Sequence, residues 1–256
     1  MQCLHVDFLV PAVLLAPFIG SFLGVLIVRV PEGRDVVFSR SACSHCGHWL
    51  GVGELLPLVS WIWLRGVCRI CSGSIGLFYP AIELAAVAVV IWAAIAAPSG
   101  PALWASCIYG WMLLTLAIID QRHFLLPDVL TLPMILIGLA VAAMTGMDTA
   151  IDHALGAAGG FLSFALIAWV YRRLRGRDGL GEGDAKLLAG IGAWVSWTEL
   201  PRVVFLAALL GLAIALSSAV RGRRLSATDR LPFGTFLAIA GWLVWLYGPL
   251  FPNFEL

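Results

Sequence analysis

The chain has 256 residues, of which 61% are hydrophobic and 12% charged, and its formal net charge is +1. Its mean hydropathy of +0.96 lies well above the range of soluble globular proteins. The composition excludes a soluble globular protein, indicates a polytopic protein in contact with membrane lipids, and gives no reason to expect nucleic acid as a partner.

The first apolar run, residues 8–28, is long enough to span a bilayer, because about 20 apolar residues cross the roughly 30 Å hydrocarbon core. Asp7 precedes the run and Arg29 follows it, the reverse of the charge order in a cleavable signal peptide. Residues 1–28 are therefore predicted to form a retained transmembrane helix with its N-terminus outside.

Residues 29–78 are the one long polar segment, and we predict that they form a separate cytoplasmic domain. The remainder, residues 79–256, is dominated by apolar runs. These runs cover residues 79–97, 101–119, 127–145, 152–171, 185–197, 202–220 and 232–250. Together with the first helix they predict an all-α membrane bundle of about eight crossings, of which the sixth is short for a span.

The basic residues test this topology. Of the 16 Lys and Arg residues, 15 fall in alternate loops, and only Arg202 lies in an opposite loop. The positive-inside rule makes the basic loops cytoplasmic and both termini periplasmic.

Four of the six cysteines form two Cys-x-x-Cys pairs in the polar segment. The pairs are Cys43 with Cys46 and Cys68 with Cys71. Two thiolate pairs on short loops suit tetrahedral zinc, and a closed site of four thiolates is structural because no coordination position stays open. Four reduced cysteines in an ordinary loop, or a redox pair, are the alternatives.

His45 and His48 lie close enough in the sequence to replace a cysteine ligand, although a solvated loop histidine explains them equally. Cys3 and Cys107 fall outside the pattern and receive no role.

Asp120 ends the apolar run 101–119, where the helix macrodipole disfavours an acid. It needs a compensating partner, such as Arg122 or His123, or a function. Asp128 has a structural explanation, because Pro127 suits the first turn of the next helix and an acid there complements its positive end.

Asp184 lies in the sequence Gly181-Glu182-Gly183-Asp184-Ala185-Lys186, just before the short apolar run 185–197. Its glycines, with Gly179, would allow positive φ and a close approach of substrate to the backbone. Alternatively the loop is merely flexible, and Asp184 is the N-cap of the following helix.

Both aspartates are predicted to open to the cytoplasmic face. Two such carboxylates could share one proton, as in aspartyl proteases, so the central hypothesis is an aspartyl protease at the membrane surface.

These motifs, taken together, resemble the bacterial prepilin leader peptidases, which are bifunctional with an N-methyltransferase and belong to the GxGD class of membrane aspartyl proteases. The resemblance covers almost the whole chain. It is carried by Gly20 to Val25 with Arg29-Val30-Pro31, the cysteine pairs, Ile119-Asp120 with Leu126-Pro127-Asp128, Gly181 to Leu187, and Pro232-Phe233-Gly234.

The resemblance implies an enzyme of the bacterial inner membrane that removes the basic leader of type IV prepilins or type II secretion pseudopilins, cutting after a glycine on the cytoplasmic side. Asp120 and Asp184 carry over as the catalytic pair, and the substrate loop includes Gly181, Gly183, Lys186 and Asp128. Family members then methylate the new N-terminus with S-adenosylmethionine. No residue set in the sequence indicates a pocket for that cofactor, and nothing indicates an oligomeric state.

Two residues depart from the family pattern. Ser44 stands where the first knuckle usually has proline, and Thr235 stands where the family often has another proline. We expect neither residue to contact the aspartates.

Two other classes of protein compete with the protease. A proton-coupled transporter would need acids deep inside its spans, and among the predicted spans only Glu83 approaches that position. A non-enzymatic membrane scaffold with a zinc knuckle explains the cysteines but leaves Asp120 and Asp184 without a role.

Overall fold

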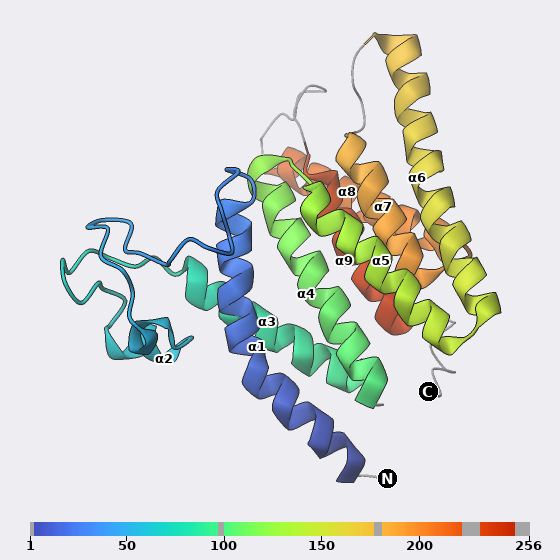
Figure 1. Ribbon diagram of the computed structural model, residues 1–256. Helices are drawn as coiled ribbons and strands as arrows, with labels where there is room; N and C mark the ends of the chain where they lie inside the picture. Colours follow the sequence, from blue (N-terminus) through green and yellow to red (C-terminus); the bar gives the residue numbers. More distant parts are fainter. Residues whose placement is uncertain (1–2, 97–99, 177–180, 222–230, 249–256) are drawn as a thin grey trace. The chain divides into compact units, whose positions relative to one another are not determined.

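The structure is a computed structural model that describes residues 3–96, 100–176, 181–221 and 231–248 (Figure 1). Within these ranges the chain is helical, with two isolated antiparallel bridges in the polar segment. The helices are α1 (Cys3–Arg29), the 3-10 turn η1 (Val52–Leu55), α2 (Val59–Trp63), α3 (Phe78–Ala96), α4 (Gly100–His123), α5 (Asp128–Thr145), α6 (Met147–Arg175), α7 (Glu182–Val195), α8 (Leu200–Val220) and α9 (Phe233–Tyr247). The chain divides into two compact units, residues 1–111 and 112–256, and α4 runs across the division.

The predicted all-α membrane bundle is confirmed. Each of the eight predicted apolar runs coincides with a helix, and six helices of the described residues are long and apolar enough to cross a membrane. The six are α1, α3, α4, α5, α6 and α8. Because α7 has only 14 residues and α9 only 15, at 1.5 Å per residue both fall short of the bilayer core, so the predicted number of eight crossings is approximate.

In the first unit, α1 packs closely against α3. A Cβ on Gly20 would lie 2.6 Å from the Cα of Glu83, and a Cβ on Gly24 would lie 2.8 Å from the Tyr79 ring. Glycine at these two positions therefore lets the helices approach backbone to backbone. The polar segment that contains η1 and α2 connects these two helices.

In the second unit, α7 is the central helix. Ten of its 14 residues are buried, in keeping with a sequence that is apolar on nearly every side after its first turn. It packs against α5, α6 and α9 (Figure 1). Trp194 fixes two of these contacts, because its indole N–H donates to the Met134 carbonyl of α5 at 2.9 Å and its ring meets Trp245 of α9 edge to face at 5.4 Å. A short helix, surrounded by longer ones, thus positions the Asp184 region.

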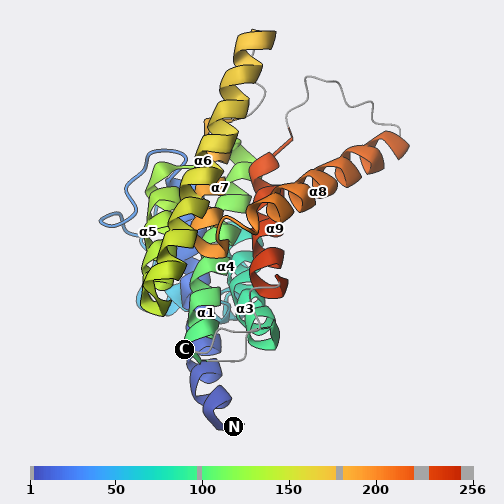
Figure 2. The same cartoon turned by 90° about the vertical axis from the view of Figure 1, so that its right-hand side faces the viewer.

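Glycines also set the distance between α6 and α7. A Cβ on Gly156 would collide with the carbonyl oxygen of Gly192, and a Cβ on Gly192 would collide with that of Gly156. A Cβ on Gly160, one helical turn along α6, would lie 2.7 Å from the Leu188 carbonyl oxygen. The contact is backbone against backbone, as at small-residue interfaces in membranes. By contrast, α8 leans away from α9 towards its C-terminal end (Figure 2).

We predict that Gly156→Ala destabilises the protein by about 1–3 kcal/mol, because a methyl group must push α6 away from α7. The matched control is Gly159→Ala on the same helix, where a Cβ meets nothing within 4 Å. That control should be neutral or slightly stabilising, since alanine favours a helix over glycine. Thermal unfolding in detergent measures both, and equal melting temperatures for the two variants would contradict the close contact.

Candidate active site and metal centre

Four helix ends meet at one end of the second unit. The C-terminal turn of α4 carries Asp120, and its carboxylate contacts Thr235 in the first turn of α9. Asp128 at the start of α5 forms a 2.6 Å ion pair with Lys186 in the first turns of α7. Asp184 lies in the same first turn of α7. The structure thus brings together the two predicted catalytic residues, and Lys186 and Asp128 beside them.

Asp120 caps α9 from another helix. Its side chain is buried, with 5% of the residue exposed, and Oδ2 accepts the Thr235 backbone N–H at 2.7 Å and the Thr235 hydroxyl at 3.1 Å. Thr235 is the third residue of α9, where backbone N–H groups lack acceptors within the helix. The positive end of α9 therefore compensates the unfavourable position of Asp120 at the negative end of α4.

This contact corrects one expectation. Thr235, a departure from the family pattern, does touch an aspartate. Its hydroxyl also lies 3.0 Å from the Ala117 carbonyl oxygen of α4, so the side chain joins the two helix ends. A proline at this position would have neither the N–H nor the hydroxyl that binds Asp120.

Asp184 is not the N-cap of α7. Gly181 is the N-cap, and Asp184 is the third helical residue, with its carboxylate accepting the Gly181 backbone N–H. The acid is partly buried and lies at the positive end of its helix. Like that of Asp120, its carboxyl group therefore lies beside the N-terminus of a helix.

The glycines before Asp184 act through close packing. Gly181 has φ −71°, and Gly183 lies within α7, so neither adopts the positive φ that glycine would allow. A Cβ on Gly183 would lie 2.9 Å from the Cβ of Leu126, which is buried in the α4–α5 loop. Gly179 lies outside the described residues.

Gly234 repeats this arrangement at the start of α9. A Cβ there would lie 2.9 Å from the Leu126 side chain and 3.0 Å from the Asp120 carboxyl carbon. Gly183 and Gly234 are each the second residue of their helix, so two glycine-bearing helix ends close on one leucine beside the aspartates. In the sequence, Gly234 stood out only as part of the Pro232-Phe233-Gly234 motif, which did not indicate the residues that Gly234 contacts.

The two carboxyl groups interact electrostatically. Asp184 precedes the apolar run of α7 and lies outside the six candidate spans. Burial, followed by the negative charge of Asp120, raises the pKa of Asp184 to about 6. Two acids of which one readily holds a proton are the arrangement that aspartyl protease chemistry requires.

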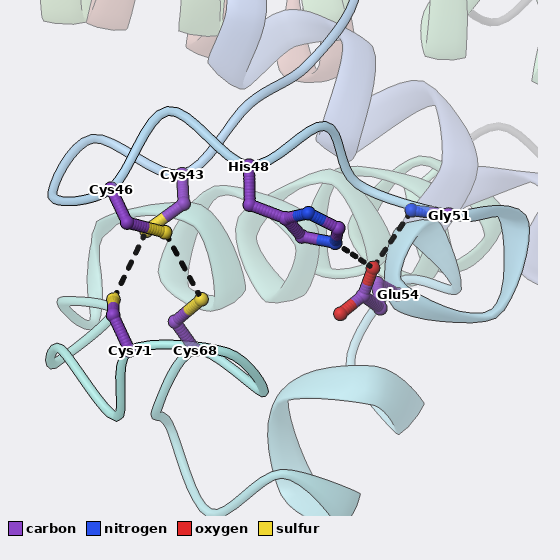
Figure 3. A network of polar contacts seen from close by, with 7 residues as sticks. All are labelled: Cys43, Cys46, His48, Gly51, Glu54, Cys68 and Cys71. Carbon is purple, nitrogen blue, oxygen red and sulfur yellow. Dashed lines mark hydrogen bonds and ion pairs between the residues drawn. The ribbon is translucent and has the colours of Figure 1, made fainter.

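The four predicted metal-binding cysteines form a cluster in the first unit (Figure 3). Their sulfur atoms all lie within 4.8 Å of one another, with Cys43 3.8 Å from Cys71 and Cys46 4.0 Å from Cys68. Tetrahedral zinc with Zn–S bonds of about 2.3 Å requires sulfurs roughly 3.8 Å apart, whereas a disulfide requires about 2.05 Å. The four thiols are therefore placed to bind a metal ion and are not disulfide-bonded.

Each cysteine pair lies on a tight turn, which we call a knuckle, and the two knuckles have the same backbone hydrogen-bond pattern. The N–H of Cys43 donates to the His48 carbonyl at 2.8 Å, and the N–H of Cys68 donates to the Gly73 carbonyl at 2.9 Å. Gly47 and Ser72, each four residues after the first cysteine, both have positive φ. Each knuckle thus turns tightly enough to present both of its sulfurs to one side.

Backbone N–H groups also favour the thiolate form of the first cysteine in each knuckle. The N–H groups of Cys46 and His45 lower the pKa of Cys43 to about 6. Those of Cys71 and Ile70 lower the pKa of Cys68. Thiolates are the form that binds metal, so the backbone favours the metal-binding form at the first cysteine of each knuckle.

The histidines do not join the sulfur cluster. His45 Nε2 lies 3.2 Å from the Ser74 carbonyl oxygen, and His48 Nε2 lies 3.7 Å from Glu54 (Figure 3). The donor set among the described residues is therefore four cysteines, the set that closes a zinc site without an open position.

Comparison with known proteins covers both units. Residues 14–97 match the family described as Bacterial Peptidase A24 N-terminal domain, and residues 107–216 match the Type IV leader peptidase family. Among the curated relatives, the prepilin leader peptidase/N-methyltransferase of Aeromonas hydrophila is 36% identical over 254 residues, which cover 90% of this chain and 87% of the relative. The protein of the same name from Burkholderia pseudomallei (strain 1026b) is 38% identical, over 94% of this chain and 85% of the relative. That from Pseudomonas aeruginosa is 36% identical, over 94% of this chain and 91% of the relative.

The chain belongs to the type IV leader peptidase family. No solved structure matches it significantly. The family membership confirms the resemblance drawn from the aspartate and cysteine motifs. The matched ranges include Asp120 and Asp184 in the leader peptidase region and all four clustered cysteines in the N-terminal region.

From the raised pKa of Asp184 we predict how the stability of the folded protein depends on pH. A carboxyl group whose folded pKa lies above its unfolded value binds more protons in the folded state, so its unfavourable contribution grows as pH rises from about 4 to 6 and is then constant. We expect Asp184→Asn to raise the melting temperature at pH 8 by several degrees and to raise it much less at pH 4. Melting temperatures in detergent at the two pH values provide the measurement.

The control for this experiment is Asp148→Asn, which changes an exposed aspartate at the start of α6. It should show no comparable gain at pH 8. If Asp184→Asn and the unmodified protein had the same melting temperature at both pH values, the ionised form of Asp184 would not be destabilising in the folded protein.

Proposed function

We propose that this chain is a membrane aspartic endopeptidase that removes the basic leader of type IV prepilins or of type II secretion pseudopilins after a glycine. The observation that carries the proposal is that the carboxyl groups of Asp120 and Asp184 lie close enough to interact electrostatically, at the end of the second unit where four helices end. The chain also belongs to the type IV leader peptidase family. Curated relatives are named as prepilin leader peptidases and N-methyltransferases. We propose both activities for this chain.

The different surroundings of the two acids support different starting roles for them. Asp120 accepts two hydrogen bonds from Thr235 on Oδ2, which favour its carboxylate form, so we assign it the role of the general base that takes a proton from the attacking water. Asp184, with its raised pKa, carries the proton that is donated to the scissile carbonyl oxygen and then reaches the leaving amine. The peptide C–N bond breaks after water oxygen has bonded to the carbonyl carbon, and the pair ends with one proton, as it began.

The substrate meets this pair at the inner face of the cytoplasmic membrane. The chain is a multi-pass membrane protein, and the basic loops next to α4 and α7 support, by the positive-inside rule, a cytoplasmic position for the acidic ends of these helices and periplasmic termini. We propose that Gly181, Gly183 and the Lys186–Asp128 ion pair border the path of the leader. Membrane lipids surround the helices on which these residues lie.

Zinc and S-adenosylmethionine are the proposed cofactors. Zinc held by Cys43, Cys46, Cys68 and Cys71 is structural, because it would close a segment with few aliphatic residues of its own. S-adenosylmethionine is the methyl donor for the new N-terminus. The N-methyltransferase names of the relatives support this second activity.

Membership of a peptidase family weighs against the transporter and the scaffold. Glu83, the acid that approached the middle of a predicted span, binds the backbone N–H of Leu58 in the polar segment at 2.8 Å, which places it near one end of α3.

The protease proposal predicts that Asp120→Asn and Asp184→Asn each lower the rate of prepilin cleavage at least about 100-fold, since each removes one partner of the proton transfer. Asp148→Asn, on the exposed start of α6, should cleave at the normal rate. Mass spectrometry of a prepilin incubated with purified enzyme in detergent measures the shortened product and any added methyl group. Normal cleavage by either dyad variant would sink the mechanism.

The metal proposal predicts about one zinc per chain in protein purified with its thiols reduced. Cys46→Ser and Cys71→Ser should lose the metal, since three thiolates bind it more weakly than four. Cys107→Ser, at a buried position of α4 outside the cluster, should keep it. Elemental analysis by mass spectrometry decides the matter, and unmodified protein without stoichiometric zinc would refute the site.

A further inference from the structure

The polar segment between α1 and α3 has an exposed apolar surface on the short helix α2. Residues 55–64, which include α2, carry no charged side chain. Val59, Ile62 and Trp63 are three and four residues apart, so they share one face of α2. Each is more than half exposed, and Trp63 is 83% exposed. We call these three residues the apolar face of α2.

The other side of α2 belongs to the interior of the first unit. Ser60, Trp61 and Leu64 line a cavity beside the cysteine cluster, whereas the apolar face does not. The Trp61 indole N–H donates to the Ile75 carbonyl at 3.1 Å, which fixes the rotation of α2 about its axis. The apolar face therefore keeps a constant direction and is open only to partners from outside the polar segment.

A hydrogen bond sets the level of α2 along the membrane-spanning helix α3. The N–H of Leu58, the residue before α2, donates to Oε2 of Glu83 at 2.8 Å. Glu83 is the sixth residue of α3, and α3 is a candidate span from its first residue, Phe78. At 1.5 Å per residue, Glu83 lies about 7 Å along the span. The start of α2 is therefore within one glutamate side chain of a turn that lies inside the span.

The position of α1 gives the same level independently. A Cβ on Gly20 would lie 2.6 Å from the Cα of Glu83, so these two residues are side by side. Arg29 ends the α1 span and follows Gly20 by nine residues, or about 13 Å of helix. The start of α2 is thus beside the spans and not beyond their ends. At that level a membrane protein is surrounded by lipid headgroups and the first part of the acyl chains.

The residues at the end of the uncharged stretch also suit a membrane boundary. Trp63 is one of the most exposed aromatic side chains of the segment, and tryptophan is enriched where acyl chains meet headgroups. Arg65 and Arg69 follow shortly after it. Arginine beside an apolar surface is attracted to lipid phosphates. The order apolar, tryptophan, arginine therefore matches the order of layers from the acyl chains outwards.

We propose that the apolar face of α2 is inserted into the phospholipid bilayer, at the boundary of headgroups and acyl chains. The occupant of this surface is lipid because α1 and α3 are embedded in lipid at the same level. Amphipathic elements that lie on a membrane bury an apolar face about 5–10 Å deep in this way. The polar segment then rests on the membrane, with its cavity on the side of α2 that faces away from the acyl chains. This inference does not rest on the proposed function.

Photocrosslinking of the full-length protein in phospholipid nanodiscs tests the proposal. The photoreactive residue benzoylphenylalanine is introduced in place of Trp63, or in place of Ile62, and mass spectrometry identifies what it has bonded to after irradiation. Both positions should give phospholipid adducts. Their yield should be comparable to that at Leu14, an exposed residue in the middle of the α1 span.

Phe38 is the matched control, because it is an aromatic residue of the same segment and is 90% exposed. Its loop is held at the end of α1, where the Arg29 guanidinium binds the carbonyl oxygens of Asp35 and Ser39. Trp63 should give several times the lipid adduct of Phe38. Equal yields would overturn the proposal, since exposure alone would explain them. Adducts of Trp63 with protein, whether a second copy or another part of the chain, or no adduct at all, would overturn it too.

A second measurement tests whether the apolar side chains themselves cause the insertion. The double substitution Val59→Ser and Ile62→Ser removes apolar area and leaves the photoreactive group at position 63 in place. The lipid adduct at position 63 should fall several-fold, whereas Phe38→Ser should not change it. Melting temperatures show that the variants remain folded. An unchanged yield in the folded double variant would overturn the role of the apolar face.

Discussion

The hydrogen bonds between the Asp120 carboxylate and Thr235 at the start of α9 are the contact on which the second unit depends. A carboxylate at the C-terminal end of a helix is unfavourable, and the first N–H groups of a helix need acceptors from elsewhere. One contact satisfies both requirements. It also fixes α9 against α4, and α9 in turn packs through Trp245 on Trp194 of the buried helix α7. The proposed catalytic acid is thus part of the packing that positions its partner.

The surroundings of the two aspartates differ, although the carboxyl group of each contacts the N-terminus of a helix. Asp120 receives two donors on one oxygen from Thr235. Asp184 receives the Gly181 N–H and experiences the charge of Asp120, with burial as the larger cause of its raised pKa. The two carboxyl groups thus differ in their hydrogen-bond donors, and their mutual repulsion favours a state in which the pair holds one proton.

The sequence was sufficient for the features that depend on composition and short spacing. The helices follow from apolar runs, and the cysteine cluster follows from two Cys-x-x-Cys pairs. It was insufficient where a contact joins distant segments. Thr235 was expected to be remote from the aspartates because nothing local connects residues 120 and 235. The glycines near Asp184 were explained by backbone freedom, whereas Gly183 and Gly234 instead allow two helix ends to close on Leu126. Neither the partner of a carboxylate nor the neighbour of a glycine can be read from a linear pattern.

The same limit applies to the polar segment, where the cysteine cluster adjoins a cavity of about 280 Å³. Cys43 and Cys68 line the cavity, and both also belong to the sulfur cluster. An ion that joins the two knuckles would therefore hold two parts of the cavity wall at a fixed separation, in a segment whose own apolar contacts are few. The aspartate dyad is built from α4, α7 and α9 and includes none of these cysteines. A metal ion bound by the four cysteines would thus stiffen the first unit without taking part in the aspartate pair of the second unit.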